Sequence, residues 1–181
     1  MDRDRFVDLL LETANLKRVP RSGWLLRGVP HVESVAEHSF GVAFVALALA
    51  DLEGGLDLEK VLAMALLHDL AEVRLTDLPL SAARLIPGPV KSQAEAVALG
   101  DLLAPLPGGA RLQALWQEFK DGSSAEARLV RDADKLEMMV QCLRYEQAGS
   151  RGLGEFWRTM DRHQWHHALS ADLYARLRAM R

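Results

Sequence analysis

The chain has 181 residues, of which 49% are hydrophobic and 26% charged, and its formal net charge is −3 at pH 7. This length and balance predict one globular domain with a single core rather than a disordered or fibrous protein. The weakly acidic charge argues against a nucleic-acid partner, which would favour a basic face. A single cysteine, Cys142, excludes an internal disulfide and a cysteine-rich metal site.

The sequence also gives no sign of a membrane segment. No apolar run approaches the roughly 20 residues needed to cross a bilayer, and the longest, residues 42–50, lies within a helix-like pattern. The N-terminus is charged in both signs and lacks the apolar centre of a signal peptide. We therefore expect no membrane partner and a cytoplasmic location.

Helical periodicity dominates the first half of the chain. Apolar residues three and four apart predict a first helix that ends before Pro20. Ser34 and Glu37 form a capping-box pattern ahead of a second helix, which extends to about residue 51, where two glycines break it. Asp57 is expected to cap a third helix that continues toward Val73.

The second half is also helical. Residues 77–89 contain three prolines and a glycine and are expected to be mostly loop, whereas 90–104 and 109–120 predict two helices. A second capping-box pattern, Ser123 with Glu126, opens a helix that reaches about Gln147. No alternating β-branched run predicts a strand. We therefore predict a single all-α domain over 1–181, with a core at about 16–147 and a C-terminal helical extension at about 154–181.

Four titratable residues fall on faces that the periodicity assigns to the core. His38 lies on an apolar helical stripe, and a satisfied core histidine is its alternative explanation. His68 and Asp69 directly follow seven apolar residues, where unpartnered ionisable groups are costly to bury, and a structural ion pair is their alternative. Asp134 shares a partly apolar face, whereas its neighbour Asp132 is interpreted as solvated.

Together the two imidazoles and two carboxylates form a ligand set for one divalent metal ion. Mixed nitrogen and oxygen donors suit Co²⁺ and Mn²⁺ above all, then Ni²⁺, Fe²⁺ or Zn²⁺, and accept Mg²⁺ less readily. No thiolate contributes, which argues against a closed structural zinc site. Four protein ligands leave open positions on a six-coordinate ion, which is typical of a catalytic metal.

The order of these residues resembles the HD-domain phosphohydrolase superfamily. The His-Asp doublet alone is uninformative, but the extended pattern is specific. It consists of Ser-Val-Ala-Glu-His-Ser at 34–39, His-Asp-Leu-Ala-Glu at 68–72, Asp-Leu-Pro at 77–79 and Ala-Asp at 133–134. This combination is similar to the 5′-deoxynucleotidase branch of the superfamily, over about residues 16–146.

The resemblance implies a helical fold around one metal ion, a homodimer, and hydrolysis of deoxyribonucleoside 5′-monophosphates. His38, His68, Asp69 and Asp134 match the family's metal ligands.

Other matching positions imply roles in catalysis and substrate binding. Glu72 matches the catalytic acid, Arg21 the phosphate-binding arginine, and Trp24 and Asp77 the residues that contact the sugar. The spacing between arginine and tryptophan varies in the family, so Arg18 stays an alternative to Arg21. One departure affects the loop that presents Asp77, because Thr76 stands where members often have glycine.

The chemistry is also consistent without the resemblance. On a continuous helix, Glu72 would lie one turn after His68 and could relay a proton to the leaving oxygen. An arginine of the basic stretch 17–31 offers a planar fork to two phosphate oxygens, with a surface charge as the alternative. A packing role for Trp24 and a turn-capping role for Asp77 also stay open.

Other functions also stay open. The chain could be another HD-type phosphohydrolase, acting on a cyclic nucleotide, a nucleoside triphosphate or a phosphorylated small molecule. It could also be a non-catalytic metal- or nucleotide-binding domain, or a helical interaction module without a metal. His163, His166 and His167 are a weaker candidate metal site, since Asp161 is the one carboxylate within a turn of them.

Overall fold

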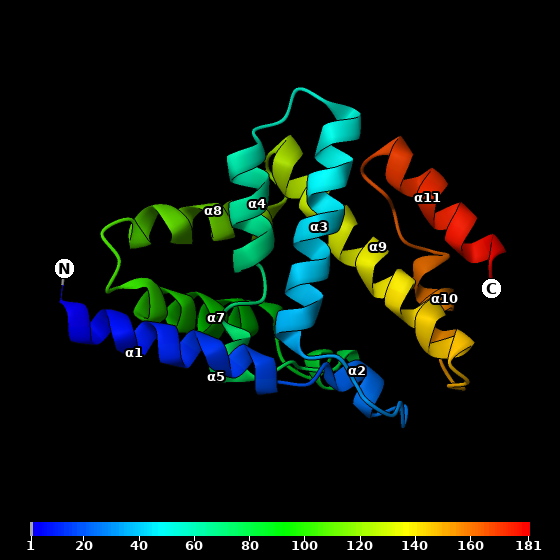
Figure 1. Cartoon of the computed structure of the whole chain (residues 1–181), viewed down its shortest axis with the longest axis horizontal. Helices are drawn as coiled ribbons and strands as arrows, with labels where there is room; N and C mark the ends of the chain where they lie inside the picture. Colours follow the sequence, from blue (N-terminus) through cyan, green and yellow to red (C-terminus); the bar gives the residue numbers. More distant parts are fainter. Residues whose placement is uncertain (1) are drawn as a thin grey trace.

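The computed structural model describes residues 2–181, and this range contains helices and no strand, which confirms the all-α prediction (Figure 1). The elements are α1 (Arg3–Ala14), the 3₁₀ helix η1 (Asn15–Arg18), α2 (Ser22–Leu25), α3 (Val35–Glu53), α4 (Leu58–Leu67), α5 (Glu72–Leu75), α6 (Leu80–Ala83), α7 (Gly88–Leu103), α8 (Gly109–Asp121), α9 (Ala125–Gln147), α10 (Gly154–Met160) and α11 (Ala168–Ala179).

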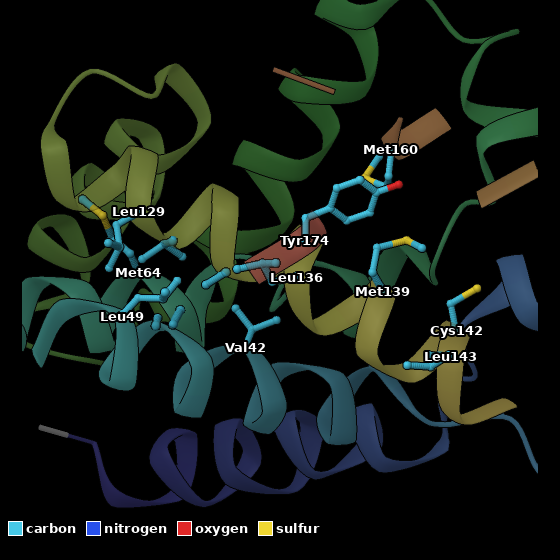
Figure 2. Packing of buried hydrophobic residues seen from close by; sticks show 14 of the residues in the cluster. Val42, Leu49, Met64, Leu129, Leu136, Met139, Cys142, Leu143, Met160 and Tyr174 are labelled. Carbon is cyan, nitrogen blue, oxygen red and sulfur yellow. The ribbon is translucent and has the colours of Figure 1, made fainter. Parts of the chain in front are cut away.

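Helices α3, α4 and α9 form the centre of the molecule, and α10 and α11 pack beside α9 (Figure 1). Val42 of α3, Met64 of α4 and Leu136 of α9 belong to one apolar cluster that continues along α9 to Cys142 (Figure 2). Burying each such side chain stabilises the fold by about 1.5–3 kcal/mol relative to leaving it exposed. The packing of this cluster therefore fixes how the three central helices sit against one another.

Helix α3 combines this buried stripe with an apolar outer face. By length and composition alone it could span a membrane, with a mean hydropathy of 1.5 over an 18-residue window. In the structure it packs against α4, α9 and η1. Phe40 and Phe44, four residues apart, lie on its exposed face and are 75% and 63% accessible to solvent.

A second, smaller cluster joins α7 and α8 to the end of α4. It contains Leu67, Ala71, Leu99 and Trp116. The indole Nε1 of Trp116 donates a hydrogen bond to the carbonyl oxygen of His68 at 3.2 Å. This layer therefore holds the turn that follows α4.

The predicted third helix ends earlier than the sequence indicated. Helix α4 stops at Leu67, and residues 68–71 form tight turns before the short α5 begins at Glu72. The N–H of Leu70 bonds to the carbonyl of Leu67, and the N–H of Glu72 to that of Asp69, so the hydrogen bonds join residues three apart. Glu72 therefore does not follow His68 on one continuous α-helix, which corrects the prediction.

Two other predicted boundaries shift. Segment 77–89 is mostly loop, as predicted, but it also contains α6, and α7 begins at Gly88, two residues before the predicted start, with a proline in its first turn, where no N–H is needed. The second capping box is displaced: Ser124 caps α9, and Glu126 instead accepts a hydrogen bond from the N–H of Asp57.

Candidate metal centre

The structure brings the four predicted ligand residues together from three parts of the chain. His38 lies in the first turn of α3, His68 and Asp69 in the turn after α4, and Asp134 in α9. His38 Nε2 lies 3.4 Å from His68 Nε2 and 3.3 Å from Asp134 Oδ1. His68 Nε2 lies 3.2 Å from Asp69 Oδ2. Residues from three separate segments thus bring their donor atoms together in one cluster.

The start of α3 explains the position of His38. Ser34 accepts a hydrogen bond from the N–H of Glu37, and the Glu37 carboxylate accepts one from the N–H of Ser34, which confirms the predicted capping box. This box fixes where the helix begins. His38 follows one residue later and is completely buried beneath the turn.

Both imidazoles are oriented by a hydrogen bond at their other ring nitrogen. His38 Nδ1 lies 2.5 Å from Glu137 Oε2, and His68 Nδ1 lies 2.7 Å from the carbonyl oxygen of Ala65. In the neutral ring, an acceptor at Nδ1 places the proton there and leaves the lone pair of Nε2 for a metal ion. Both Nε2 atoms then face the carboxylates, as metal-binding imidazoles require.

The electrostatics of the cluster favour bound positive charge. Burial opposes ionisation of Asp134, but Lys135 and His38 hold its pKa well below its usual range. Burial and Arg21 oppose protonation of His38, yet its hydrogen bonds to Asp134 and Glu137 raise its pKa to about 9. The carboxylates therefore favour positive charge on His38, which a proton supplies at neutral pH and which a metal ion would supply in its place.

This donor set fits a divalent ion. The donor atoms of His38, His68 and Asp69 lie 3.2 to 3.8 Å apart and form one group that could hold an ion, and Asp134 borders this group at 3.3 Å from His38. Bonds near 2.1 Å produce a spacing of about 3.0–3.4 Å around one ion. Once an ion displaces the proton of His38, two neutral imidazoles and two carboxylates would balance its double positive charge. The residues present thus suit a mixed nitrogen and oxygen site for a first-row transition metal.

Arg21 and Asp77 border this cluster. Arg21 Nη1 donates to Asp77 Oδ1 at 2.9 Å and to Asp69 Oδ2 at 3.3 Å. The N–H of Ser22 donates to Asp77 Oδ2 at 2.5 Å, and the Ser22 hydroxyl donates to the Asp77 carbonyl at 2.7 Å. Arg18, in contrast, is exposed on η1. The structure therefore places Arg21, and not Arg18, beside the predicted ligands.

Glu72 faces the same region despite the break between α4 and α5. Its Oε2 atom is buried and has no hydrogen-bond partner among residues 2–181. Burial, together with the negative charges of Asp69 and Asp77, raises the pKa of Glu72 to about 9. Its carboxyl group therefore carries a proton at neutral pH and can give it to a bound molecule.

The residue before Asp77 has a strained backbone. Thr76 has a φ of 61° and a ψ of 162°, a region that residues other than glycine rarely adopt, at a cost of about 1–3 kcal/mol. The position is thus one that glycine would suit, as the family pattern indicates. The hydrogen bonds from Arg21 and Ser22 to Asp77 hold this segment in place.

A cavity of about 380 Å³ opens next to Arg21 and Asp77. Trp24 lines it but is only 2% exposed, and its indole Nε1 donates to Glu33 Oε1 at 2.8 Å. The Trp24 ring lies against Phe156 of α10, with centroids 4.1 Å apart. Further lining side chains are mostly apolar or cationic and include Met138, Met160, Leu80, Arg27, Arg84, Lys91 and Lys135, together with Ser81, Thr159 and the acidic Glu155.

Sequence reasoning missed two residues here and misplaced a third. Glu137 lies three residues after Asp134 on α9, so helical spacing could have indicated that it faces the same side. Phe156 gave no signal, because α10 reaches the cavity only through tertiary packing. Asp132 was predicted to be solvated, which is wrong: it is completely buried and accepts hydrogen bonds from the N–H groups of His166 and His167.

The three C-terminal histidines lie between α10 and α11 and their side chains have different partners. His166 Nδ1 bonds to Asp132 Oδ1 at 2.8 Å, while His167 Nδ1 lies 3.7 Å from Glu53. The ring of His163 instead contacts Trp165 edge to face, with centroids 4.8 Å apart. Two of these histidines therefore have carboxylate partners on other helices.

Comparison with known proteins shows the family of the chain. The HD-domain family profile matches residues 13–172. The chain is 34% identical to the 5′-deoxynucleotidase HDDC2 of Danio rerio over 146 residues, which are 80% of this chain and 71% of that protein. It is 38% identical to the human protein of the same name over 133 residues, 72% of this chain and 63% of that protein.

Solved structures agree with the fold. A conserved hypothetical protein from Pyrococcus furiosus superposes with a TM-score of 0.81 and 40% identity, covering 96% of this chain and 98% of that one. A protein from Magnetospirillum magnetotacticum, described as a predicted metal-dependent phosphohydrolase, gives a TM-score of 0.69 over 98% of this chain and 89% of its own, at 24% identity. The chain belongs to the HD-domain family, in the branch of hydrolases that includes proteins named 5′-deoxynucleotidase.

Proposed function

We propose that the protein hydrolyses deoxyribonucleoside 5′-monophosphates to the deoxynucleoside and phosphate, with one divalent metal ion held by His38, His68, Asp69 and Asp134. The observation that carries this proposal is that the four predicted donors converge directly beside Arg21 and the buried, unpartnered carboxyl group of Glu72. The relatives named 5′-deoxynucleotidase support the same reaction class.

A bound ion supplies charge neutralisation and an activated nucleophile at neutral pH. Arg21 binds the phosphate oxygens, because its guanidinium group lies 3.3 Å from Asp69 and so directly borders the metal ligands. Its contacts with Asp69 and Asp77 fix the side chain before the substrate arrives, which reduces the entropy lost on binding.

Glu72 donates the proton that the leaving 5′-oxygen needs. A nucleoside alkoxide is a poor leaving group, so proton transfer to it contributes typically 10²–10⁴-fold to the rate. Burial near Asp69 and Asp77 keeps the Glu72 carboxyl protonated at neutral pH, with a pKa of about 9. The otherwise unpartnered Oε2 atom is suited to this role.

The nucleoside occupies the neighbouring cavity. A volume of about 380 Å³ lies at the small end of the range for small-molecule sites, about 300–1,000 Å³. Asp77 accepts a hydrogen bond from a sugar hydroxyl, and Trp24 and Phe156 provide an apolar wall for the sugar and base. Arg84 lines the same cavity and adds a cationic group for an anionic ligand.

Phosphate release from a panel of substrates tests the proposal. The panel contains deoxy- and ribonucleoside 5′-monophosphates, a cyclic nucleotide, a deoxynucleoside triphosphate and a sugar phosphate, each with Co²⁺, Mn²⁺ or Mg²⁺. We expect Co²⁺ or Mn²⁺ to support fastest release from the deoxynucleoside monophosphates. The Glu72→Gln variant should lose about 10²–10⁴-fold in kcat, whereas Glu59→Gln, at an exposed position on α4, should match the wild type.

Metal-loaded wild type that releases no phosphate from any monophosphate would contradict the proposal. Faster release from the triphosphate, the cyclic nucleotide or the sugar phosphate would instead assign the site to another HD-type reaction.

We further propose that the protein forms a homodimer through the exposed face of α3. Phe40 and Phe44 present large apolar surface there, and exposed apolar patches of this kind are typical of protein contacts. Light scattering should report a dimer, and Phe44→Asp should shift it to a monomer; a monomeric wild type would contradict this.

The cytoplasmic location stays a prediction, which cell fractionation would test.

A further inference from the structure

We propose that Glu137 is a positioning residue for the metal centre, and that it holds the His38 imidazole so that Nε2 faces the metal ion. This inference rests on the proposed metal-dependent function. Glu137 bonds to His38 at Nδ1, the ring nitrogen opposite the predicted donor Nε2. It therefore acts on the metal centre through His38.

The contact between the two residues is short and shielded from water. Glu137 Oε2 lies 2.5 Å from His38 Nδ1. The His38 side chain is completely buried and that of Glu137 is 11% exposed. A buried carboxylate that accepts the Nδ1 proton fixes both the tautomer and the plane of the ring, and it makes Nε2 a stronger electron donor.

The two imidazoles differ in what orients them. His68 bonds to the carbonyl of Ala65, three residues earlier in its own helix, so its orientation is set locally. His38 depends on a side chain from α9, which also supplies Asp134. Glu137 therefore couples the ligand of α3 to the ligand of α9, and the metal centre needs this contact between helices to form.

A glycine in α3 gives independent support. Gly41 lies in the middle of α3, where glycine weakens a helix relative to alanine. A Cβ atom placed on Gly41 would lie 2.7 Å from Glu137 Oε1 and 2.8 Å from Glu137 Cγ. Any other residue at this position would therefore push the Glu137 carboxylate away from His38. The absence of a side chain at Gly41 makes the space that Glu137 occupies.

Glu33 lies on the far side of this pair, and its carboxylate, His38 and Glu137 have potential ligand atoms within 4.8 Å of one another. A second cation held by this group would require Glu137 as a ligand rather than as a hydrogen-bond acceptor. The stoichiometry of metal binding separates these two roles, because positioning predicts one ion per chain.

Calorimetric titration of metal-free protein with Mn²⁺ or Co²⁺ tests the proposal without reference to activity. We expect the wild type to bind one ion and Glu137→Gln to bind one ion with a Kd raised about 10–100-fold. The visible spectrum of the Co²⁺ form should also change, since the His38 ring is reoriented. Glu146→Gln is the matched control. Glu146 lies on α9 like Glu137, but it accepts hydrogen bonds from Trp157 and Arg181 instead of a histidine. The Kd of this variant should match the wild type.

Gly41→Ala provides a second variant, in which the substitution itself favours helix formation. Alanine favours the helix, so any loss of metal affinity would come from displacement of Glu137. We expect its Kd to rise as in Glu137→Gln, whereas Gly88→Ala, where the added Cβ has no atom within 4 Å, should leave Kd unchanged. Thermal melting of each metal-free variant reports whether it is folded.

The outcomes are distinguishable. Equal metal affinity in wild type, Glu137→Gln and Gly41→Ala would overturn the positioning role and leave the proposed function standing. Two ions bound by the wild type and one by Glu137→Gln would overturn it in favour of a direct ligand. A wild type that binds no ion would overturn the proposed function and this inference together.

Discussion

Two carboxylates of α9, only two residues apart, lie in opposite surroundings. Asp132 faces the C-terminal extension and is completely buried. Its two oxygens accept hydrogen bonds from the N–H groups of His166 and His167 and from the His166 ring. Every contact that the structure gives it is a donor from a neighbouring segment. The negative charge is therefore satisfied by the protein itself.

Asp134 faces the centre of the molecule. Its partners are Lys135, 2.7 Å away, and the ring of His38, and a second carboxylate, Asp69, belongs to the same cluster. Two carboxylates beside one imidazole repel each other unless positive charge lies among them, which Lys135 and a protonated His38 supply in the metal-free protein and a metal ion would supply in the loaded protein. A buried carboxylate held by donors of one neighbouring segment is structural, whereas one grouped with a second carboxylate and two imidazoles indicates a site for an external cation.

The largest expected effect follows from removing the second kind of carboxylate. Asp134→Ala deletes a proposed metal ligand, so we expect metal affinity to fall more than about 100-fold, beyond the effect of an orienting residue, and phosphate release to become undetectable. Calorimetric metal titration and circular dichroism measure the two properties separately. Retained metal affinity in a folded variant would place Asp134 outside the metal site.

Asp132→Ala should show the reverse pattern. It leaves three part-buried donors without their charged acceptor, so we expect the free energy of unfolding to fall by about 1–3 kcal/mol. Metal affinity of the folded variant should stay within about threefold of the wild type, because the C-terminal extension does not supply a ligand. Urea denaturation measures the first effect. A large loss of metal affinity would remove the distinction between the two carboxylates.

Glu33 extends the comparison to a third way of satisfying a buried carboxyl, which is protonation. Burial and the negative charge of Glu137 raise the pKa of Glu33 from 4.5 to about 7. The folded state therefore binds this proton more tightly than the unfolded chain, and the stability it contributes is complete below pH 4.5 and lost as pH rises to 7. This difference in pKa corresponds to about 3 kcal/mol in the free energy of unfolding.

The Glu33→Gln variant should lack this dependence while its amide oxygen still accepts from Trp24. We expect the metal-free wild type to lose stability relative to the variant between pH 5 and pH 7.5, as measured by urea denaturation at each pH. Parallel pH profiles for the two proteins would show that Glu33 is ionised in the folded state throughout.

The smallest expected effect concerns the loop that presents Asp77. Thr76→Gly relieves a positive φ of 61°, and after the entropy cost of glycine we expect the free energy of unfolding to rise by about 1 kcal/mol. The more flexible loop should hold Asp77 less firmly and raise KM with little change in kcat. Thermal melting and steady-state kinetics measure these effects. A destabilised variant would show that Thr76 makes contacts worth more than its strain.

The sequence by itself determined the helical class and the residues that converge. Apolar spacing placed His38, His68, Asp69 and Asp134 on inward faces. Burying two imidazoles and two carboxylates needs a compensating partner, which predicted that they converge. The capping box at Ser34 also followed from local hydrogen bonding, which depends on residues close in sequence.

Only the tertiary structure decided which of several similar residues lie at the candidate metal centre. Periodicity says which face of a helix is apolar, but not what packs against a polar residue, so the burial of Asp132 beneath the C-terminal segment could not be foreseen. The choice of Arg21 over Arg18 depends on its pairing with Asp77, 56 residues away. The orientation of Glu72 depends on where α4 ends, and that end is held by the second layer of helices through Trp116.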